Sequence, residues 1–175
     1  MSRPHFTIRP ERPSDLEAIR ALNDAAFGQP AEGRLVDALR RTAAFSPELS
    51  LVAENGQSLI GHILFTKVTV REERAVHPAL ALAPMAVAPA WQRRGVGSAL
   101  VDRGLREARA QGHAVVIVLG HPDYYPRFGF RPAGPLGIRS PFDAPEEAFL
   151  ALELRPGALR GVRGTVEYPP EFMAL

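Results

Sequence analysis

Cysteine is absent from the 175-residue chain. Without thiols the protein cannot form disulfides, a thiolate metal site or a cysteinyl intermediate. No apolar run reaches the roughly 18 residues of a membrane span, and the N-terminal stretch MSRPHFTIRP lacks the apolar core of a signal peptide. We therefore expect a cytoplasmic protein, compatible with a reducing environment and without a membrane partner.

Charge of one sign and aromatic side chains are also scarce. The formal net charge is +2, and Phe, Trp and Tyr together make up 7% of the residues. Proteins that bind nucleic acids usually carry a larger, clustered basic excess, so no nucleic-acid partner is expected. The histidines show no metal-ligand spacing, and we expect no metal. The length fits one domain that spans residues 1–175.

Apolar periodicity predicts strands that first follow one another and later alternate with helices. This order indicates an α/β protein with a mixed sheet flanked by helices. The dipeptide Asn55-Gly56 predicts a tight hairpin. Strands are predicted at residues 5–9, 49–54, 59–70, 80–87, 114–119, 148–154 and 164–168, with part of a Pro- and Gly-rich loop at 129–147 also extended. Helices are predicted at residues 14–27, 31–42 and 95–111, with a helical turn at 123–128.

Two arginines and two glycines precede the predicted third helix, in the stretch AWQRRGVGSALVDRGL at residues 90–105. The first N–H groups of a helix have no intrahelical partner, and the helix dipole adds partial positive charge there. Gly95 and Gly97 let a ligand approach the backbone, and Arg93 and Arg94 add full charge. The combination is typical of a phosphate or pyrophosphate site. The alternative is an ordinary turn with solvated arginines.

Neither common nucleotide motif fits this turn. A P-loop requires Lys followed by Ser or Thr after its last glycine, whereas Ser98 follows Gly97 directly. A dinucleotide fingerprint requires a third glycine where this chain has Leu100. The phosphate-bearing ligand is therefore expected to be of another kind.

Pro84 lies inside the predicted strand before this turn. A proline in a central strand removes a ladder donor, so we expect the strand to part from a neighbour here. Backbone groups of Met85, Ala86 and Val87 then need other partners, which an extended ligand with amide groups would provide. Coenzyme A combines such an arm with a pyrophosphate. The alternative is an edge strand or a bulge hydrated by water.

These features resemble the GNAT superfamily of N-acetyltransferases. The family motif Gln/Arg-x-x-Gly-x-Gly/Ala is matched by residues 92–97, and Tyr-x-x-x-Gly-Phe is matched by Tyr125, Gly129 and Phe130. The chain is further similar to a bacterial subgroup of predicted acetyltransferases, the YhbS-like proteins. That similarity is carried by AFG at 26–28, GHILF at 61–65, LAPMAV at 82–87, YYPRFGF at 124–130 and LRPGAL at 154–159.

The resemblance implies a GNAT fold, whose mixed and mostly antiparallel sheet contains a splayed parallel pair. It implies transfer of acetyl from acetyl-CoA to a primary amine of a small molecule or peptide, by direct attack in a ternary complex. A homodimer is possible, and an acetyl-CoA-binding regulatory module without catalysis is the alternative. The implied cofactor-binding residues are Met85, Ala86, Val87, Gln92, Arg93, Arg94, Gly95, Val96, Gly97 and Ser98.

The resemblance also suggests the catalytic residues. Tyr125 matches the family tyrosine that protonates the departing thiolate, with Tyr124 as its rival. A base must take the proton of the amine, and His62, Glu32 and His121 are candidates, with water as the alternative. His62 is also explained as a hydrogen-bonded core residue, Glu32 as a carboxylate favoured near a helix start, and His121 as a turn residue.

One position departs from the family pattern. Many GNAT sequences have asparagine seven residues before the tyrosine, where this chain has Val118. The cofactor contacts on this side are therefore left open, with residues 120–123 as a replacement. On the third helix, Arg103, Arg106 and Arg109 could reach a second phosphate, although a solvated face with interspersed acidic residues explains them equally.

Overall fold

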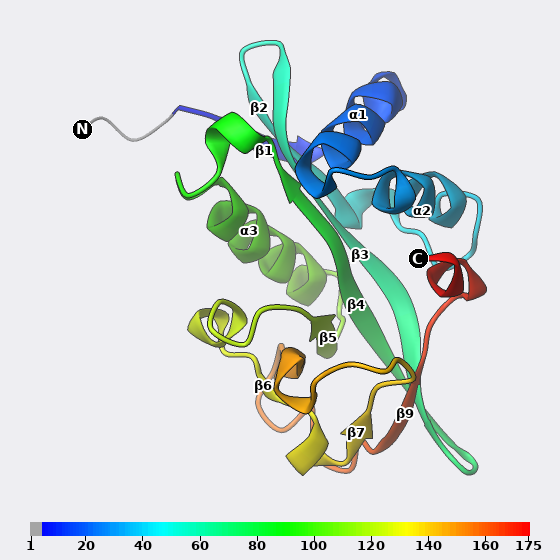
Figure 1. Ribbon diagram of the computed structural model, residues 1–175. Coiled ribbons are helices and arrows are strands. Elements are labelled where there is room, and N and C mark those ends of the chain that lie inside the picture. Colours follow the sequence, from blue (N-terminus) through cyan, green and yellow to red (C-terminus); the bar gives the residue numbers. More distant parts are fainter. Residues whose placement is uncertain (1–4) are drawn as a thin grey trace.

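A nine-stranded sheet runs through the computed structural model, which describes residues 5–175 (Figure 1). The strand order is β1-β2-β3-β4-β5-β8-β6, and β9 pairs with both β3 and β7. Pairing is antiparallel except for the β4–β5 and β7–β9 pairs. The strands are β1 (Thr7–Pro10), β2 (Ser50–Asn55), β3 (Ser58–Glu72), β4 (Ala75–Val87), β5 (Val115–Leu119), β6 (Arg131–Pro132), β7 (Ile138–Arg139), β8 (Phe149–Glu153) and β9 (Gly164–Glu167). The predicted mixed, mostly antiparallel sheet is confirmed.

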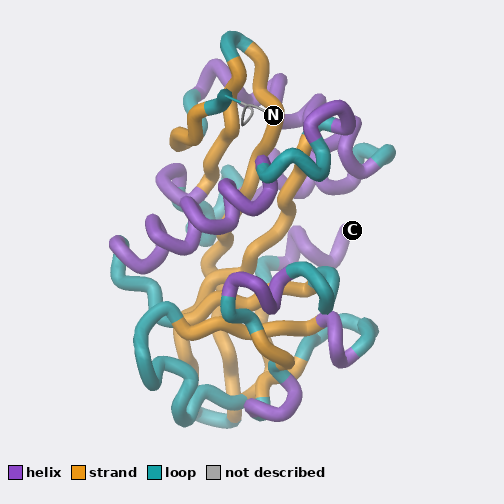
Figure 2. Tube along the Cα trace, turned by 90° about the vertical axis from the view of Figure 1, so that its left-hand side faces the viewer, coloured by secondary structure: helices purple, strands orange, loops and turns teal. Residues whose placement is uncertain are grey.

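Helices cover both faces of this sheet, with α3 on one side and α1 and α2 on the other (Figures 1 and 2). They are α1 (Leu16–Phe27), α2 (Ala31–Leu39) and α3 (Val96–Ala110). Successive residues of a strand point to opposite faces, so Ile63 packs in the core beneath α3 while Leu64 packs beneath α1 and α2. Gly104 of α3 lets the Phe65 ring lie against the helix, because a Cβ there would be 2.2 Å from the ring.

The hairpin between β2 and β3 forms where Asn55-Gly56 predicted it, with Asn55 paired to Ser58 and Gly56 at φ 60°. The next hairpin is longer than predicted. Both β3 and β4 continue to a turn at Glu73, whose φ is 48°. Arg71 and Glu72 are exposed, so the end of this hairpin has little of the apolar alternation by which sequence patterns detect strands.

Strands β4 and β5 form the splayed parallel pair. Their ladder consists of Leu80 with Val116 and Ala81 with Ile117. Beyond it, β4 remains on β3 and β5 remains on β8, so the two strands diverge. Pro84 lies in the diverging part of β4, as predicted. It also lies where the β3–β4 register shifts between the Ile63–Met85 and Phe65–Leu82 pairs, so the bulge that was the alternative is present as well.

The boundaries of the helices differ from the predicted ones by a few residues. The first helix was predicted at residues 14–27, and α1 begins later, at Leu16, after a 3-10 turn at Pro13–Asp15. The second was predicted at residues 31–42, and α2 ends earlier, at Leu39. The segment at 129–147 is irregular apart from β6, β7 and short 3-10 turns. Within residues 5–175, no helix combines the length and apolarity required to cross a membrane.

Candidate active site

The edge of β4 that faces the splay carries backbone groups without a strand partner. The Ala88 N–H donates to the Ile60 carbonyl at 2.9 Å, and bonded and non-bonded pairs alternate along an antiparallel ladder. The N–H and C=O groups of Val87 and Met85 therefore point away from β3, toward the side that β5 has left. Consistent with this, the Val87 carbonyl accepts a hydrogen bond from Gln92 Nε2 at 3.1 Å.

The turn from β4 into α3 exposes the helix N-terminus. Arg93 has φ 59°, and Gly95, the N-cap, has φ 85°. The second value lies in the left-handed region, which glycine adopts without the steric penalty of a Cβ. The helix begins at Val96, so the N–H groups of its first turn have no intrahelical acceptor. Gly97 lies close to the opposite wall, since a Cβ there would be 3.2 Å from the Tyr124 hydroxyl.

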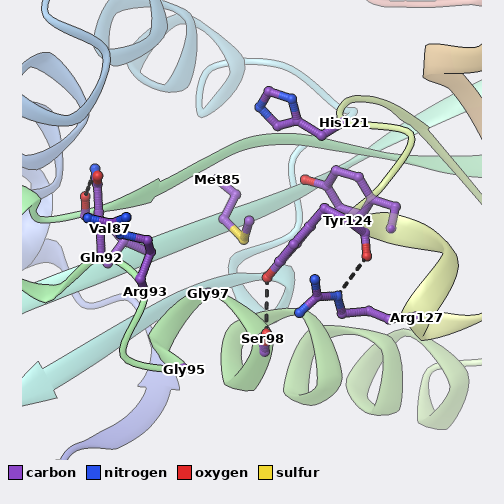
Figure 3. A pocket seen from close by; sticks show the side chains of 11 residues that line it. Met85, Val87, Gln92, Arg93, Gly95, Gly97, Ser98, His121, Tyr124 and Arg127 are labelled. Carbon is purple, nitrogen blue, oxygen red and sulfur yellow. Dashed lines mark hydrogen bonds between the residues drawn. The ribbon is translucent and has the colours of Figure 1, made fainter.

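A cavity of about 670 Å³ joins the free β4 edge to this turn (Figure 3). Figure 3 shows Gln92, Arg93 and Gly95 at one end, and His121 and Tyr124 at the other. The lining residues are Met85, Val87, Gln92, Arg93, Gly95, Gly97, Ser98, His121, Tyr124, Tyr125 and Arg127. Most of the predicted cofactor residues are thus brought together around one hollow.

Three residues of the predicted cofactor set do not line this cavity. Ala86 is buried with 2% of its surface exposed, and Val96 is fully buried in the core beneath α3. The Arg94 guanidinium carbon lies 5.6 Å from the centre of the Trp91 ring, a cation–π contact on the outside of the turn. Because the side chains of Ala86 and Val96 are buried, these two residues present only backbone groups to the hollow.

Tyr125 is held by packing in the wall of the cavity. Its ring is buried, with ring centroids 5.1 Å from Tyr124 and 5.6 Å from Phe130. Gly120 is required beside it, because a Cβ there would lie 2.4 Å from the Tyr125 ring. Burial, with a smaller contribution from Tyr124, raises the pKa of the Tyr125 phenol above its ordinary value. The phenol is therefore protonated at neutral pH and can donate a proton.

Tyr124 bridges the two walls. Its hydroxyl lies 3.2 Å from Ser98 Oγ at the start of α3. Arg127 holds the ring from behind, with its Nε donating to the Tyr124 carbonyl at 3.0 Å and its guanidinium carbon 4.5 Å from the ring centre. Sequence reasoning missed Arg127, because only the folded turn at Tyr125–Phe128 brings it back over Tyr124.

The arginines of α3 that were considered for a second phosphate lie elsewhere. Arg103 Nε donates to Glu107 at 2.9 Å, one helical turn along. Arg109 Nε donates to the Leu154 carbonyl at 2.6 Å and so ties α3 to the end of β8. Neither these two nor Arg106 lines the cavity.

The candidate base His62 lies outside the cavity, on the sheet face covered by α1 and α2. It is fully buried, 2.9 Å from Ser50 Oγ through Nε2 and 3.3 Å from Asn23 Nδ2 through Nδ1. The Ser50 hydroxyl in turn donates to Glu11, which also accepts from Arg40. Burial, with a smaller effect from Arg40, lowers the pKa of His62 to about 3. The contacts are those of a neutral core histidine.

This burial predicts a pH dependence of folding stability. An unfolded histidine has an ordinary pKa of about 6.5, so between about pH 6.5 and pH 3 the unfolded chain binds a proton that the folded protein excludes. The contribution of His62 to stability is therefore complete above that window, and it falls as the pH decreases, by at most about 1.4 kcal/mol per pH unit. Urea unfolding of wild type and His62→Gln at pH 7, 6 and 5 measures this. The variant should show a flatter decline, and parallel curves would contradict the assignment. His113, whose pKa burial also lowers, contributes equally to both proteins.

Glu32, the other candidate base, also lies away from the cavity. It is in the first turn of α2, where Gln29 Nε2 donates to its Oε1 at 3.1 Å. Helix α2 packs with α1 on the face opposite α3 (Figure 1). The position near a helix N-terminus is itself favourable for a carboxylate.

A splayed sheet edge, a bare helix N-terminus and a buried phenol thus lie around one hollow. Residues 7–133 match the acetyltransferase (GNAT) domain family. The chain therefore belongs to the GNAT family of N-acetyltransferases.

The sequence relatives support the same family. The chain is 42% identical over 144 residues to the uncharacterized N-acetyltransferase YjhQ of Escherichia coli K12, covering 82% of this chain and 80% of YjhQ. It is 36% identical over 165 residues to the uncharacterized N-acetyltransferase YhbS of the same strain, covering 94% and 97% of the two chains. The resemblance to YhbS-like proteins is confirmed.

Two solved structures extend this similarity to the fold. The crystal structure of Escherichia coli YhbS in complex with CoA has a TM-score of 0.90 and 34% identity, covering 99% of this chain and 94% of YhbS. A GNAT acetyltransferase from Brucella melitensis in complex with acetyl-CoA has a TM-score of 0.79 and 34% identity, covering 97% and 99%. Relatives that share this fold thus bind CoA compounds.

Proposed function

We propose that the protein transfers acetyl from acetyl-CoA to a primary amine, of a small molecule or a peptide, by direct attack in a ternary complex. One observation carries this proposal. A single cavity joins the unpaired edge of β4, the N-terminus of α3 and the protonated phenol of Tyr125. Its CoA-bound relatives support acetyl-CoA as the ligand of that cavity.

The two ends of the cavity suit the two ends of the cofactor. The free N–H groups from Arg93 to Ser98 are donors for the pyrophosphate, which the helix dipole and the Arg93 charge also favour. The outward-facing backbone groups of Met85 and Val87 are partners for the pantetheine amides, as in the addition of a strand. The Val87 carbonyl already accepts a hydrogen bond from Gln92 Nε2 at 3.1 Å. A pantetheine amide N–H would therefore compete with Gln92 for this carbonyl.

The chemistry needs no covalent enzyme intermediate, in accord with the absence of cysteine. The neutral amine attacks the thioester carbonyl carbon, and the developing oxyanion is stabilised by a backbone N–H near Met85. Collapse of the tetrahedral intermediate breaks the C–S bond. Tyr125 then donates its proton to the departing sulfur and recovers one from the nitrogen side through solvent.

Calorimetry followed by a transfer assay tests the proposal. Acetyl-CoA and CoA should bind, and ATP should bind far more weakly, because it lacks the pantetheine arm that pairs with β4. Equal affinity for ATP would contradict the placement of the cofactor. Free thiol released from acetyl-CoA is then measured across a panel of primary amines and peptides. Binding of acetyl-CoA with no amine-dependent release would identify a regulatory module instead.

A further inference from the structure

We infer that His121 is the general base that takes the proton of the acceptor amine at this cavity. The inference rests on the proposed function, because it assigns a role within that reaction. His121 is the second residue after the end of β5, and it lines the cavity together with Tyr124 and Tyr125. Figure 3 shows it at the end opposite Gln92, Arg93 and Gly95.

The direction of the cofactor places the reacting atoms at that end. The phosphate donors lie at the turn around Gly95, and the free β4 edge leads away from it through Val87 to Met85. A pantetheine arm that follows this edge brings its thioester beside Met85, where β4 and β5 have diverged. The opposite side of this opening is the end of β5, which continues into Gly120 and His121. An amine that attacks the thioester therefore arrives next to His121.

The composition of the wall leaves few groups able to accept a proton. Among the described residues that line the cavity, the ionisable ones are Arg93, His121, Tyr124, Tyr125 and Arg127. A guanidinium stays charged at all ordinary pH values, and a phenol is an acid that seldom ionises near neutrality. Imidazole is the side chain that exchanges protons near neutral pH. No carboxylate belongs to this lining.

Backbone contacts fix His121 relative to the acid Tyr125. The His121 carbonyl accepts from the N–H of Tyr124 at 3.1 Å and from that of Tyr125 at 3.4 Å. The Gly120 N–H, just before, donates to the Ala148 carbonyl at 2.9 Å. One anchored turn thus carries both the proton donor and the proposed base. The His121 side chain is exposed, so an accepted proton can pass directly to bulk water.

The proton balance of the reaction needs such an acceptor. The incoming ammonium loses one proton to the imidazole before its nitrogen lone pair attacks the carbonyl carbon. The second proton leaves the nitrogen as the C–N bond forms and the C–S bond breaks, and it compensates the proton that Tyr125 gives to sulfur. The net products are the acetamide, the free thiol of CoA and one proton released by His121.

The other two candidate bases predicted from the sequence, His62 and Glu32, lie farther from the proposed reaction site. His62 is fully buried on the other face of the sheet, and Glu32 lies on α2, which packs on that same face. Neither residue lines the cavity. Asp123, two residues after His121, is exposed and does not line the cavity, which makes it a matched control.

The test compares acceptors of different basicity in wild type, His121→Gln, His121→Asp and Asp123→Asn. With a strongly basic alkylamine, which must be deprotonated, His121→Gln should lower kcat about 100-fold. With a weakly basic amine that is already neutral at the assay pH, the loss should be only a few-fold. His121→Asp keeps a proton acceptor and should recover part of the rate, and Asp123→Asn should match wild type. The Kd for acetyl-CoA should be unchanged in all four proteins.

Two failures are distinguishable. If wild type acetylates the alkylamine and His121→Gln is as fast, or is slowed equally for both classes of amine, the assignment of the base is overturned while the transfer reaction stands. If wild type binds acetyl-CoA and acetylates no amine, the proposed function is overturned and this inference with it.

Discussion

Replacing Gly97 by tryptophan should abolish measurable acetyl-CoA binding and leave the protein folded. Even a Cβ at this position would lie 3.2 Å from the Tyr124 hydroxyl and 3.6 Å from both Met85 Cε and Val87 Cγ2. An indole would therefore extend into the space between the α3 turn and the β4 edge. Gly97 is within α3 and its φ is not positive, so the helix itself tolerates a side chain. We expect an affinity loss of at least about 100-fold, or roughly 3 kcal/mol.

Calorimetry gives the affinity, and circular dichroism with urea unfolding reports the fold. Asp102→Trp is the matched control, because it places the same side chain on the exposed face of the same helix. Gly97→Ala should have an intermediate effect, since its single methyl meets the Tyr124 hydroxyl at a distance that a small shift relieves. Retention of wild-type affinity by a folded Gly97→Trp protein would refute the cofactor site around this turn.

The cavity wall around the start of α3 could be predicted from the sequence because its signals are local. The strand with Pro84, the arginine–glycine turn and the start of α3 are contiguous in sequence. The charged residues, the glycines and the helical pattern of apolar residues therefore appear together in one short motif. The same holds for the hairpin at Asn55-Gly56 and for the buried strand β5. In each of these segments, the residues that determine the backbone conformation are the same residues that make up the turn, hairpin or strand.

The positions of the candidate bases could not be predicted, because they depend on which face of the sheet each side chain meets. Alternation along a strand separates two faces but does not say which one lies beneath α3. His62 and Ile63 are neighbours in sequence, yet only tertiary pairing places the first under α1 and α2 and the second under α3. Likewise, Arg127 contacts Tyr124 because of the 3-10 turn between them. Such relations arise from packing across the sheet.

Tyr125→Phe should lower turnover about 100-fold while changing the Kd for acetyl-CoA by less than about two-fold. A phenylalanine retains the edge contacts with Tyr124 and Phe130 and the fit against Gly120. It removes only the hydroxyl, whose pKa is raised by burial and which therefore carries its proton when the thiolate leaves. Because the loss falls on a step after binding, kcat should fall and the affinity should not. Steady-state kinetics with one productive amine, together with calorimetry, measures both.

Tyr124→Phe is the discriminating control for this assignment. The Tyr124 hydroxyl lies 3.2 Å from Ser98 Oγ, across the cavity at the start of α3. Its removal should disturb the turn that is proposed to receive the pyrophosphate, so the Kd for acetyl-CoA should rise several-fold with a smaller change in kcat. If instead Tyr124→Phe abolishes turnover at unchanged affinity and Tyr125→Phe is active, the proton donor is Tyr124. In that event the buried Tyr125 ring serves to hold the turn that carries it, because the two residues are adjacent and their rings are in edge contact.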